Sequence, residues 1–400
     1  MVDERLYMKI KSLEVIGLFG KPDPIFLEFN DDLNIFSGMN GAGKTTLLKL
    51  MWFMISGNTD KALSEIVFSK ATIVTTLYEF SVVVDYSNEE KPISTSINLN
   101  GDLKDFKIDE SFLSIFNNYK KKDEIEWTLT RFIGSSFFLP TFRRLEGGFT
   151  TEENSLIPKF INEQSIFFHL NKEDEKNNDI NLALNNLSKK LSKKDHHFIS
   201  SLSSSDVQKL LITKYAQKLE VENLYQDQEL ILLNEKLDLV NEIMESLKNN
   251  GTITDPNRLL SVDNKLKEIN TKKMEANKPL ISFNETLKHF LPQYKVEINS
   301  NLTFVGAEQV INSSYLSAGE KQVLSFIGYN ALFNNTIFFI DEPELSLHVD
   351  WQNTLFSILN EQNPSNQFII STHSPFIYSL FPDKEFIIDD DKGCSIEGFN

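Results

Sequence analysis

Short apolar runs broken by polar residues fill the first third of the chain. Alternation with a period of two is typical of half-buried β-strands. It predicts strands in residues 8–11, 25–29, 33–37, 72–86 and 127–139. Residues 45–55 have a helical pattern instead, and they follow a glycine-rich stretch after the third strand. The first 150 residues are therefore predicted to form a mixed α/β unit with many strands.

From about residue 171 the strand-like runs disappear, and Lys, Glu, Asn and Leu dominate. Apolar residues then recur in steps of three and four, which is a heptad pattern, at Leu230, Leu233, Leu237, Val240, Met244 and Leu247. After a break at Gly251 and Pro256, the same stepping resumes at Leu259, Val262, Leu266 and Ile269. This predicts two antiparallel helices, with Pro279 and Pro292 marking their end. Two packed helices on a globular body and a projecting coiled coil both remain open.

Strand patterns return in residues 295–305, 336–340, 367–370 and 385–388. An α/β unit is thus interrupted by a helical insertion and then resumes. The predicted division is a first lobe in residues 1–165, a helical insertion in residues 166–293 and a second lobe in residues 294–400.

The stretch GMNGAGKT at residues 38–45 matches the phosphate-loop pattern G-x-x-x-x-G-K-[ST], between a predicted strand and a predicted helix. Glycines let the backbone curl so that successive N–H groups point at phosphate oxygens, and the helix adds its positive end. Lys44 is predicted to reach the β- and γ-phosphates of ATP, and the Thr45 hydroxyl to bind Mg²⁺. The predicted nucleotide-binding residues here are Gly38, Asn40, Gly41, Gly43, Lys44, Thr45 and Thr46.

Two carboxylates, Asp341 and Glu342, end an apolar strand at residues 337–340. Asp341 is predicted to hold Mg²⁺ through its water shell, and Glu342 to orient or deprotonate the attacking water. Two acids at a strand end would by themselves indicate only a solvated surface. Together with the phosphate loop they favour a catalytic pair.

The run LSAGEKQ at residues 316–322 begins a predicted helix. The Ser317 hydroxyl and the Gly319 backbone N–H suit a terminal phosphate at a helix start. Ser317 and Glu320 also have the spacing of a capping box, which is a local role. The two roles are compatible, because an anion site at a helix start needs a cap. Ser317, Gly319 and Glu320 are therefore also predicted nucleotide contacts.

These motifs, in this order, resemble those of the ABC- and SMC-type ATPases. LSAGE is similar to the family's L-S-G-G-Q signature, and DEPELSLH at residues 341–348 is similar to its Walker B motif running into the D-loop. STHSP at residues 371–375 places His373 where the family has a switch histidine that contacts the γ-phosphate. The form with Glu344 and His348 resembles RecF-like and OLD-like members. The resemblance covers residues 1–165 and 295–400.

The resemblance implies an α/β fold: an ABC-type P-loop ATPase head with a mixed sheet and two lobes, interrupted by an α-helical hairpin insertion. It implies ATP and Mg²⁺ as cofactors, with Glu342 and His373 as catalytic residues and with Thr45 and Asp341 at the metal. It also implies a homodimer or higher even oligomer. In such a dimer the ATP on the Lys44 loop of one copy is covered by the Ser317 helix of another.

One departure from the family follows the strand that ends at Leu139. Transporter-type members carry a Q-loop glutamine there, whereas residues 140–148 read PTFRRLEGG. Arg143 and Arg144 in this run either reach a phosphate or tie the lobes together, or they form surface ion pairs. Phe19, near the first strands, is a candidate for stacking on adenine.

The net charge of −17 argues against generic coating of DNA, because a uniform negative field repels a phosphate backbone. The single cysteine fits a reducing compartment. No run approaches the roughly 18 apolar residues of a membrane span, so a cytoplasmic protein without a membrane partner is expected. A dense basic cluster lies at Lys189, Lys190, Lys193, Lys194, His196 and His197. It is either a nucleic-acid contact through Lys189–Lys194 or a solvated helix face.

The short insertion and the runs DEPELSLH and LPTFRR look like those of ATPase subunits in bacterial anti-phage systems of the Septu, retron-linked and PARIS types. The resemblance implies that the ATPase holds or licenses a separate nuclease or toxin, encoded nearby. No Toprim nuclease pattern follows His373, so the effector is expected in trans. A RecF-like repair or recombination ATPase is the alternative. A transporter ATPase subunit is disfavoured by the absent Q-loop glutamine and by the insertion.

Overall fold

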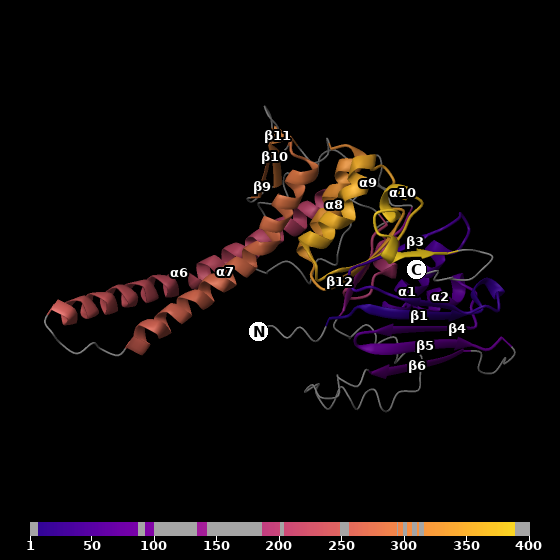
Figure 1. Ribbon diagram of the computed structural model, residues 1–400, viewed down its shortest axis with the longest axis horizontal. Helices are drawn as coiled ribbons and strands as arrows, with labels where there is room; N and C mark the ends of the chain where they lie inside the picture. Colours follow the sequence, from indigo (N-terminus) through magenta and orange to yellow (C-terminus); the bar gives the residue numbers. More distant parts are fainter. Residues whose placement is uncertain are drawn as a thin grey trace.

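The described part of the protein consists of a head, built from three sheets and their covering helices, and two long helices that project from it (Figure 1). The structure is a computed structural model, and it describes residues 7–86, 93–99, 134–141, 186–200, 204–248, 256–293, 295–298, 302–305, 310–311 and 316–388. In these residues no helix is both long enough and apolar enough to cross a membrane.

A six-stranded parallel sheet forms the centre of the head. Its order is β14 (Glu385–Ile387), β3 (Leu33–Ser37), β13 (Gln367–Ser371), β12 (Thr336–Asp341), β7 (Ser135–Leu139) and β8 (His196–Phe198). Strands from both predicted lobes take part in this sheet, with β3 between β14 and β13 and with β7 beside β12. The expectation that no strand lies in the predicted insertion is wrong, because β8 adds the edge strand beside β7.

Both faces of this sheet are buried, which explains its continuous apolar strands. Along β12 the side chains alternate between two separate cores. Ile337 and Phe339 belong to the core that contains α1 (Lys44–Ile55). Phe338 and Ile340 belong to the core that contains α8 (Ala318–Leu332) and α9 (Val349–Gln362). The helix after the phosphate loop and the helix after Ser317 therefore pack on opposite faces of the sheet.

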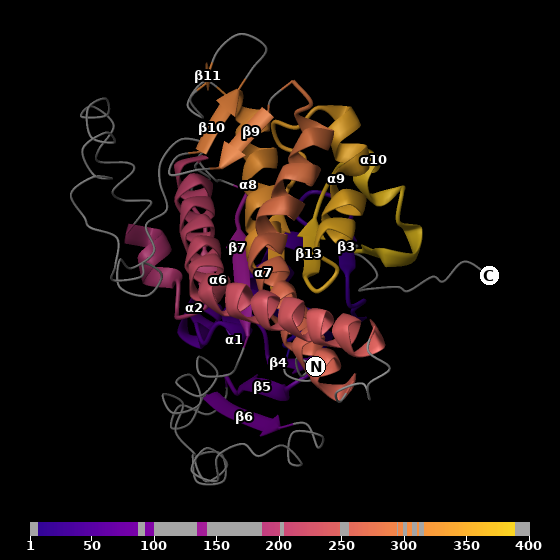
Figure 2. The same ribbon diagram turned by 90° about the vertical axis from the view of Figure 1, so that its left-hand side faces the viewer.

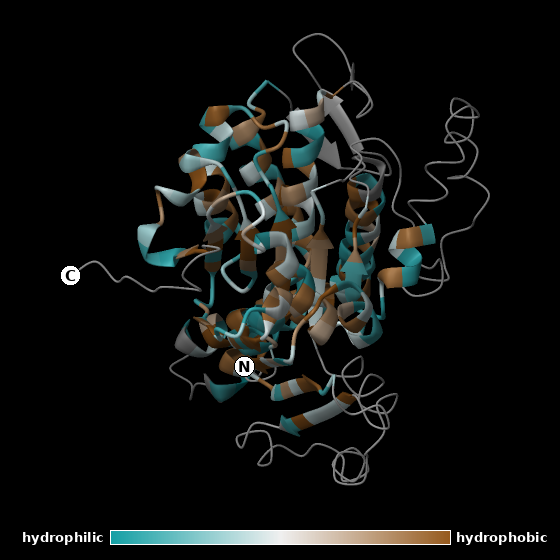
Figure 3. Ribbon diagram, turned by 90° about the vertical axis from the view of Figure 1, so that its right-hand side faces the viewer, coloured by the Kyte–Doolittle hydropathy of each residue, from teal (hydrophilic) through white to brown (hydrophobic). Residues whose placement is uncertain are grey.

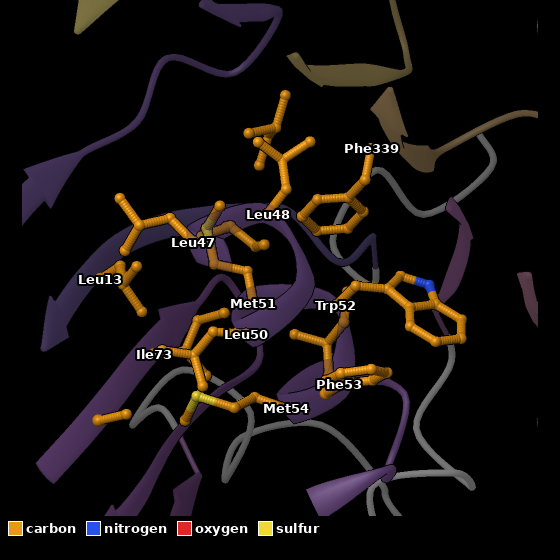
Figure 4. Packing of buried hydrophobic residues seen from close by; sticks show 14 of the residues in the cluster. Leu13, Leu47, Leu48, Leu50, Met51, Trp52, Phe53, Met54, Ile73 and Phe339 are labelled. Atoms are coloured by element: carbon orange, nitrogen blue, oxygen red, sulfur yellow. The ribbon is translucent and has the colours of Figure 1, made fainter. Parts of the chain in front are cut away.

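An antiparallel sheet covers the other side of α1. Its order is β2 (Ile25–Glu28), β1 (Ile10–Ile16), β4 (Lys70–Thr75), β5 (Tyr78–Val84) and β6 (Ile93–Leu99). Figure 4 shows α1 side chains packed between Leu13 and Ile73 of this sheet and Phe339 of β12. The predicted mixture of parallel and antiparallel strands is thus present, divided between separate sheets.

Smaller elements complete the described head. They are η1 (Leu18–Gly20), α2 (Thr59–Glu65), a helical segment at residues 186–191, α10 (Pro375–Tyr378) and η5 (Pro382–Lys384). A third, antiparallel sheet contains β9 (Lys295–Ile298), β10 (Leu302–Val305) and β11 (Val310–Ile311). Figure 2 shows β9 and β10 at the end of the molecule opposite β5 and β6.

The two projecting helices are α6 (Ser204–Lys248) and α7 (Pro256–Phe290). Ion pairs Lys236–Asp263 and Glu229–Lys273 join them, so residue numbers fall on one helix as they rise on the other, as in an antiparallel hairpin. The predicted hairpin is confirmed, and it projects (Figure 1). Of the two prolines predicted to mark the end, Pro279 lies inside α7, whereas the helix ends at Phe290, just before Pro292. Its last turns pack into the α8 core through Leu280, Phe283, Leu287 and Phe290, which offsets the hydrogen bond lost at proline.

The heptad seam predicted on α6 is also wrong in position. The buried contact between the helices uses Leu232 and Leu239, with Val262, Leu266 and Ile269 from α7. Leu230, Leu233, Leu237 and Met244 of the predicted seam are exposed instead. The stepping predicted on α7 is the one that the hairpin uses. On the helices of the head in Figure 3, brown and teal stretches follow one another, as expected for helices with an apolar face and a polar face.

Candidate nucleotide-binding site

The phosphate loop joins β3 to α1. Gly38, Gly41 and Gly43 all have positive φ angles, of 128°, 86° and 97°, a backbone conformation that glycine adopts without steric cost. Gly43 is the N-cap of α1, so the first N–H groups of this helix have no acceptor within the helix and face the loop. Asn40 and Gly41 are exposed at the outer side of the loop, and Thr46 lies half-buried in the first helical turn.

Lys44 is almost fully buried and reaches back across the loop. Its Nζ donates to the carbonyl oxygens of Gly38 at 2.9 Å and Met39 at 3.0 Å, and it lies 2.9 Å from His373 Nε2. Burial lowers the pKa of Lys44, and the carboxylates of Glu342, Asp341 and Glu344 oppose that effect. An ammonium held by carbonyl oxygens in the centre of a loop of N–H donors is placed to receive an anion.

Three hydroxyl groups converge on the carboxylate of Asp341 at the end of β12. Thr45 Oγ1 donates to Oδ1 at 2.9 Å and to Oδ2 at 3.1 Å. Ser371, at the end of β13, donates to Oδ1, and Thr141, just beyond β7, donates to Oδ2. Asp341 is 1% exposed, so this carboxylate depends on these donors in place of water. A buried carboxylate surrounded by hydroxyls is an oxygen-rich site of the kind that suits Mg²⁺.

Glu342 adopts a left-handed backbone conformation, with φ of 51°, immediately after the strand. Its Oε1 lies 3.4 Å from His373 Nε2. The backbone N–H of His373 donates to Glu344 Oε1 at 2.8 Å. Glu342, Glu344, His373 and Lys44 thus form one cluster beside the loop.

Burial, a hydrogen bond to Glu344 and the negative charges of Glu344 and Asp341 together raise the pKa of Glu342 to about 8, against the opposing charge of Lys44. A carboxyl group with a pKa near the working pH suits proton transfer.

Ser317 begins α8 with a complete capping box. Its Oγ accepts from the Glu320 N–H at 3.3 Å, and its own N–H donates to Glu320 Oε2 at 2.7 Å. A Cβ on Gly319 would lie 2.5 Å from the Ser346 carbonyl oxygen, so only glycine permits this approach to the D-loop. The local capping role predicted for Ser317 and Glu320 is present. Because α8 and α1 lie on opposite faces of the sheet, Ser317 and Lys44 are not brought together through their helices within one copy.

Phe19 lies beside the loop. Its ring is so close to Gly43 that a Cβ on this glycine would sit 2.8 Å from Phe19 Cε2, and the ring is about half exposed. An aromatic face next to a phosphate loop is available for stacking on a base. Arg143 and Arg144 lie outside the described residues.

The basic cluster is smaller than the sequence indicates. His196 is buried, with Nδ1 2.8 Å from Ser136 Oγ, and burial lowers the pKa of His196 to about 3 and that of His197 to about 4. Lys193 donates to the Gly57 carbonyl. Both histidines are therefore neutral at physiological pH, and the prediction that they add positive charge is wrong. Lys189, Lys190 and Lys194 remain exposed.

Comparison with protein families decides the class of this site. The family model described as AAA ATPase domain (AAA_15) matches residues 8–378, which is most of the chain and includes every element described above except η5 and β14. The chain belongs to this family. The glycine loop, the buried Asp341 and the adjacent Glu342 thus lie in an AAA ATPase domain.

A curated relative of this AAA ATPase domain is the Retron Vc95 probable ATPase of Vibrio cholerae serotype O1 biovar El Tor. The two are 30% identical over 122 residues, which cover 26% of this chain and 24% of the relative. The chain therefore spans about a quarter of the length of the relative that it matches.

Solved SMC head domains are similar in outline. The SmcHead bound to the C-winged helix domain of ScpA has a TM-score of 0.46 at 12% identity, over 93% of this chain and 92% of that chain. The Pyrococcus furiosus head with an extended coiled coil has a TM-score of 0.41 at 13% identity, and the Thermotoga maritima head one of 0.43 at 12% identity. Each of these covers 93% of this chain and is itself covered over 91% of its length. Likenesses at this level carry no functional argument.

Besides Ser371, whose hydroxyl bonds to Asp341, two residues of the site escaped the sequence analysis of this AAA ATPase domain. The position of Thr141 could have indicated its role. It follows the end of β7, which lies next to β12, and ligands bind at the edge of a sheet where parallel strands end. Glu344 was noted only as part of a motif, although it bonds to the His373 backbone. Neither has a residue type that indicates its role without the neighbouring strand.

Proposed function

We propose that this protein binds and hydrolyses Mg-ATP between two copies of the chain, and that the closed dimer controls a separate nuclease or toxin in anti-phage defence. The observation that carries the ATPase part is the meeting of Lys44, Asp341, Glu342 and His373 at the mouth of one glycine loop. The family match supports the same activity.

The residues present fit ATP and Mg²⁺. The glycine loop and the start of α1 offer N–H groups to phosphate oxygens, and the Lys44 ammonium adds a positive charge at their centre. Thr45 and Asp341 would hold the magnesium ion. When bound, this ion would neutralise charge that develops on the phosphates. We assign the nucleotide contacts to Gly38, Asn40, Gly41, Gly43, Lys44, Thr45 and Thr46.

Glu342 is the proposed general base. Because the pKa of Glu342 is raised to about 8, this side chain can accept a proton from the attacking water near neutral pH. His373, 3.4 Å from Glu342 and 2.9 Å from Lys44 Nζ, is the proposed sensor of the terminal phosphate. A change at the phosphate would thus alter the environment of the base directly.

The second half of each site is proposed to come from the other copy. The helix starting at Ser317 packs on the sheet face opposite α1, so it is available to cover a nucleotide held by a neighbour. The N–H groups at the start of α8, near Ser317 and Gly319, would receive the terminal phosphate. Residues 1–165 and 294–400 would form the two lobes of each head, with residues 166–293 inserted.

A mixing experiment tests this shared site. Lys44→Ala and Ser317→Arg should each abolish hydrolysis when alone. In the mixed dimer one site combines both defects and the other has neither. Because half of the dimers in an equal mixture are mixed, about a quarter of the wild-type rate should return. Absence of any recovery, while each variant still folds and Ser317→Arg still binds nucleotide, would refute the shared site.

Control of an effector is the finer part of the proposal, and it rests on the retron-associated relative and on the motif resemblance. Purification of the tagged protein from its native operon should recover a second protein. A Glu342→Gln variant, which should hold ATP in the closed dimer, should change the amount recovered. If no second protein depends on this chain or on its nucleotide state, the defence role is refuted and the ATPase activity is untouched.

A further inference from the structure

A regular apolar stripe lies exposed along the hairpin. On α6 it consists of Leu230, Leu233, Leu237 and Met244, whose side chains are 46–60% exposed. Their spacing of three, four and seven residues places them on one side of the helix, as in a coiled-coil seam. Isolated exposed leucines are ordinary, but a heptad row of them is a surface for another helix.

The hairpin itself cannot cover this row, because α6 uses a different one for α7. The inner row contains Leu232 and Leu239. Leu230 and Leu237 each precede an inner residue by two positions, and Met244 follows Leu239 by five. On a helix with 3.6 residues per turn, these offsets place the three side chains in nearly the same direction, rotated by more than 100° about the helix axis from the inner row. One helix therefore carries two apolar rows, and the structure pairs only the inner one.

The other helix extends the same surface. Leu260 precedes inner residue Val262 by two positions, and Met274 follows Ile269 by five, and both are exposed. When two antiparallel helices pack along one seam, residues at the same sequence offset from that seam lie on the same side of the helix pair. The stripe on α6 and the apolar positions on α7 therefore form one face, which we call the outer face.

The charged side chains of α6 and α7 limit which helices can bind to the outer face. Residues 220–248 of α6 carry eight acidic and two basic side chains, whereas residues 256–278 of α7 carry six basic and three acidic ones. Two identical hairpins stacked through their outer faces with α6 against α6 would bring acidic helices together. Stacked with α6 against α7, they bring an acidic helix onto a basic one at both contacts.

We propose that the outer face binds the outer face of a second copy of this chain, forming a four-helix bundle in which α6 of each copy lies on α7 of the other. For two hairpins related by a two-fold axis, α6 meets α7 only when that axis runs along the hairpins. Both heads then lie at the same end of the bundle. This contact needs no nucleotide, and it is separate from the proposed ATP-dependent contact between heads.

Oligomeric state without nucleotide tests the contact. The wild-type chain should sediment as a dimer, and Leu233→Ser/Leu237→Ser should make it monomeric, with a dissociation constant on the order of 100-fold higher. The matched control is Leu224→Ser/Ile231→Ser, which changes two exposed residues. Ile231 precedes inner residue Leu232 by one position, and Leu224 precedes Tyr225, which packs against the same inner contact, so both lie on the other side of α6 from the outer face. This control should remain dimeric. Because all four side chains are exposed, helix content by circular dichroism should be unchanged in both variants.

A single spin label tests the arrangement. Cys394→Ser removes the chain's one cysteine, and Lys248→Cys then places a label at the end of α6. With the heads at one end, the two labels should lie within about 30 Å, the width of a four-helix bundle plus the labels. In the opposite arrangement they would be more than about 40 Å apart, from a rise of 1.5 Å per residue over the shared length.

Four results would overturn the proposal. They are a wild-type monomer without nucleotide, a dimer that survives Leu233→Ser/Leu237→Ser, equal loss of the dimer in the control variant, and a long distance between the labels. A wild-type monomer whose outer face retains a different protein would likewise show that the occupant is not a second copy.

Discussion

Protonation of one buried histidine should make the head sensitive to acid. His196 in β8 is 2% exposed, and its Nδ1 lies 2.8 Å from Ser136 Oγ. The indole N–H of Trp52 donates to the same Oγ at 3.1 Å, so the serine proton is available for the imidazole, which accepts it. This hydrogen-bonded chain connects the edge strand to α1. It is satisfied by a neutral ring, and burial lowers the pKa of His196 to about 3.

The sign and size of the effect follow from linkage. The folded-state pKa is below the value of about 6.5 in the unfolded chain, so the unfolded state binds more protons between these two values. The stability contribution is therefore complete above pH 6.5 and is lost as the pH falls. The pH of 5 lies about 1.5 units below the pKa of the histidine in the unfolded chain, so nearly all unfolded chains carry the extra proton. This lowers the free energy of unfolding by about 2 kcal/mol relative to pH 7.5.

Urea unfolding of wild type and His196→Asn at pH 7.5 and 5 measures this difference. Asparagine keeps a neutral acceptor near the Ser136 hydroxyl, and His197, whose pKa burial also lowers, is present in both proteins. The variant should be less stable at pH 7.5, but it should lose about 2 kcal/mol less on acidification. His348→Asn, at a side chain that is 71% exposed, controls for loss of a histidine at the surface. Equal acid losses in wild type and His196→Asn would refute the reasoning.

Three further predictions concern the site. The folded-state pKa of Glu342 is raised, so the stability of the wild-type protein should fall as the pH rises from 4.5 to 8. Without nucleotide, the melting temperature of Glu342→Gln should therefore exceed that of wild type by an amount that grows over this pH range. A difference that stays constant with pH would contradict this. Gly319→Ala places a Cβ 2.5 Å from the Ser346 carbonyl and should cost about 1–3 kcal/mol in chemical unfolding; an unchanged midpoint would argue against the close approach. Phe19→Ala should weaken binding of a fluorescent ATP analogue about 3- to 10-fold, while Phe19→Tyr should not, and equal affinities would remove the stacking role.

The strands of the central sheet were predictable because burial of both faces leaves long apolar runs beside recognisable motifs. β8 was not, since it has only three residues and two of them are histidines. Its membership depends on pairing with β7, on the hydrogen bond from Ser136 to His196 and on the ring contact of Phe138 with Phe198, all of which join residues far apart in sequence. The sequence pattern around β8 does not indicate partners that lie so far away along the chain.

The hairpin shows a different limit. Residues 230–247 contain a more regular heptad row than the one that packs, so periodicity alone selected the wrong row on α6. Which row of α6 packs depends on how α6 and α7 are aligned. In the observed alignment the ion pairs Lys236–Asp263 and Glu229–Lys273 join the two helices. On α7, which has a single dominant row, the same reasoning succeeded.

For the site, motif order was sufficient to predict that Lys44, Thr45, Asp341 and Glu342 meet, because the parallel strands β3 and β12 end at the same edge of one sheet. The hydroxyl of Thr141 could not be anticipated from its residue type. The predicted contact between the Ser317 helix and the nucleotide of another copy stays a prediction.

The two proposed contacts between copies make a joint prediction. If the hairpins hold both heads at one end of a bundle, closure of the heads is intramolecular, with an effective concentration on the order of millimolar. The rate of ATP hydrolysis per molecule should then be independent of protein concentration from nanomolar to micromolar. In Leu233→Ser/Leu237→Ser the heads must meet by diffusion, so the rate per molecule should rise with concentration and approach the wild-type value at the highest concentrations. Loss of activity at every concentration would instead indicate a damaged head. A concentration-dependent rate in wild type would mean that the hairpins do not hold the heads together.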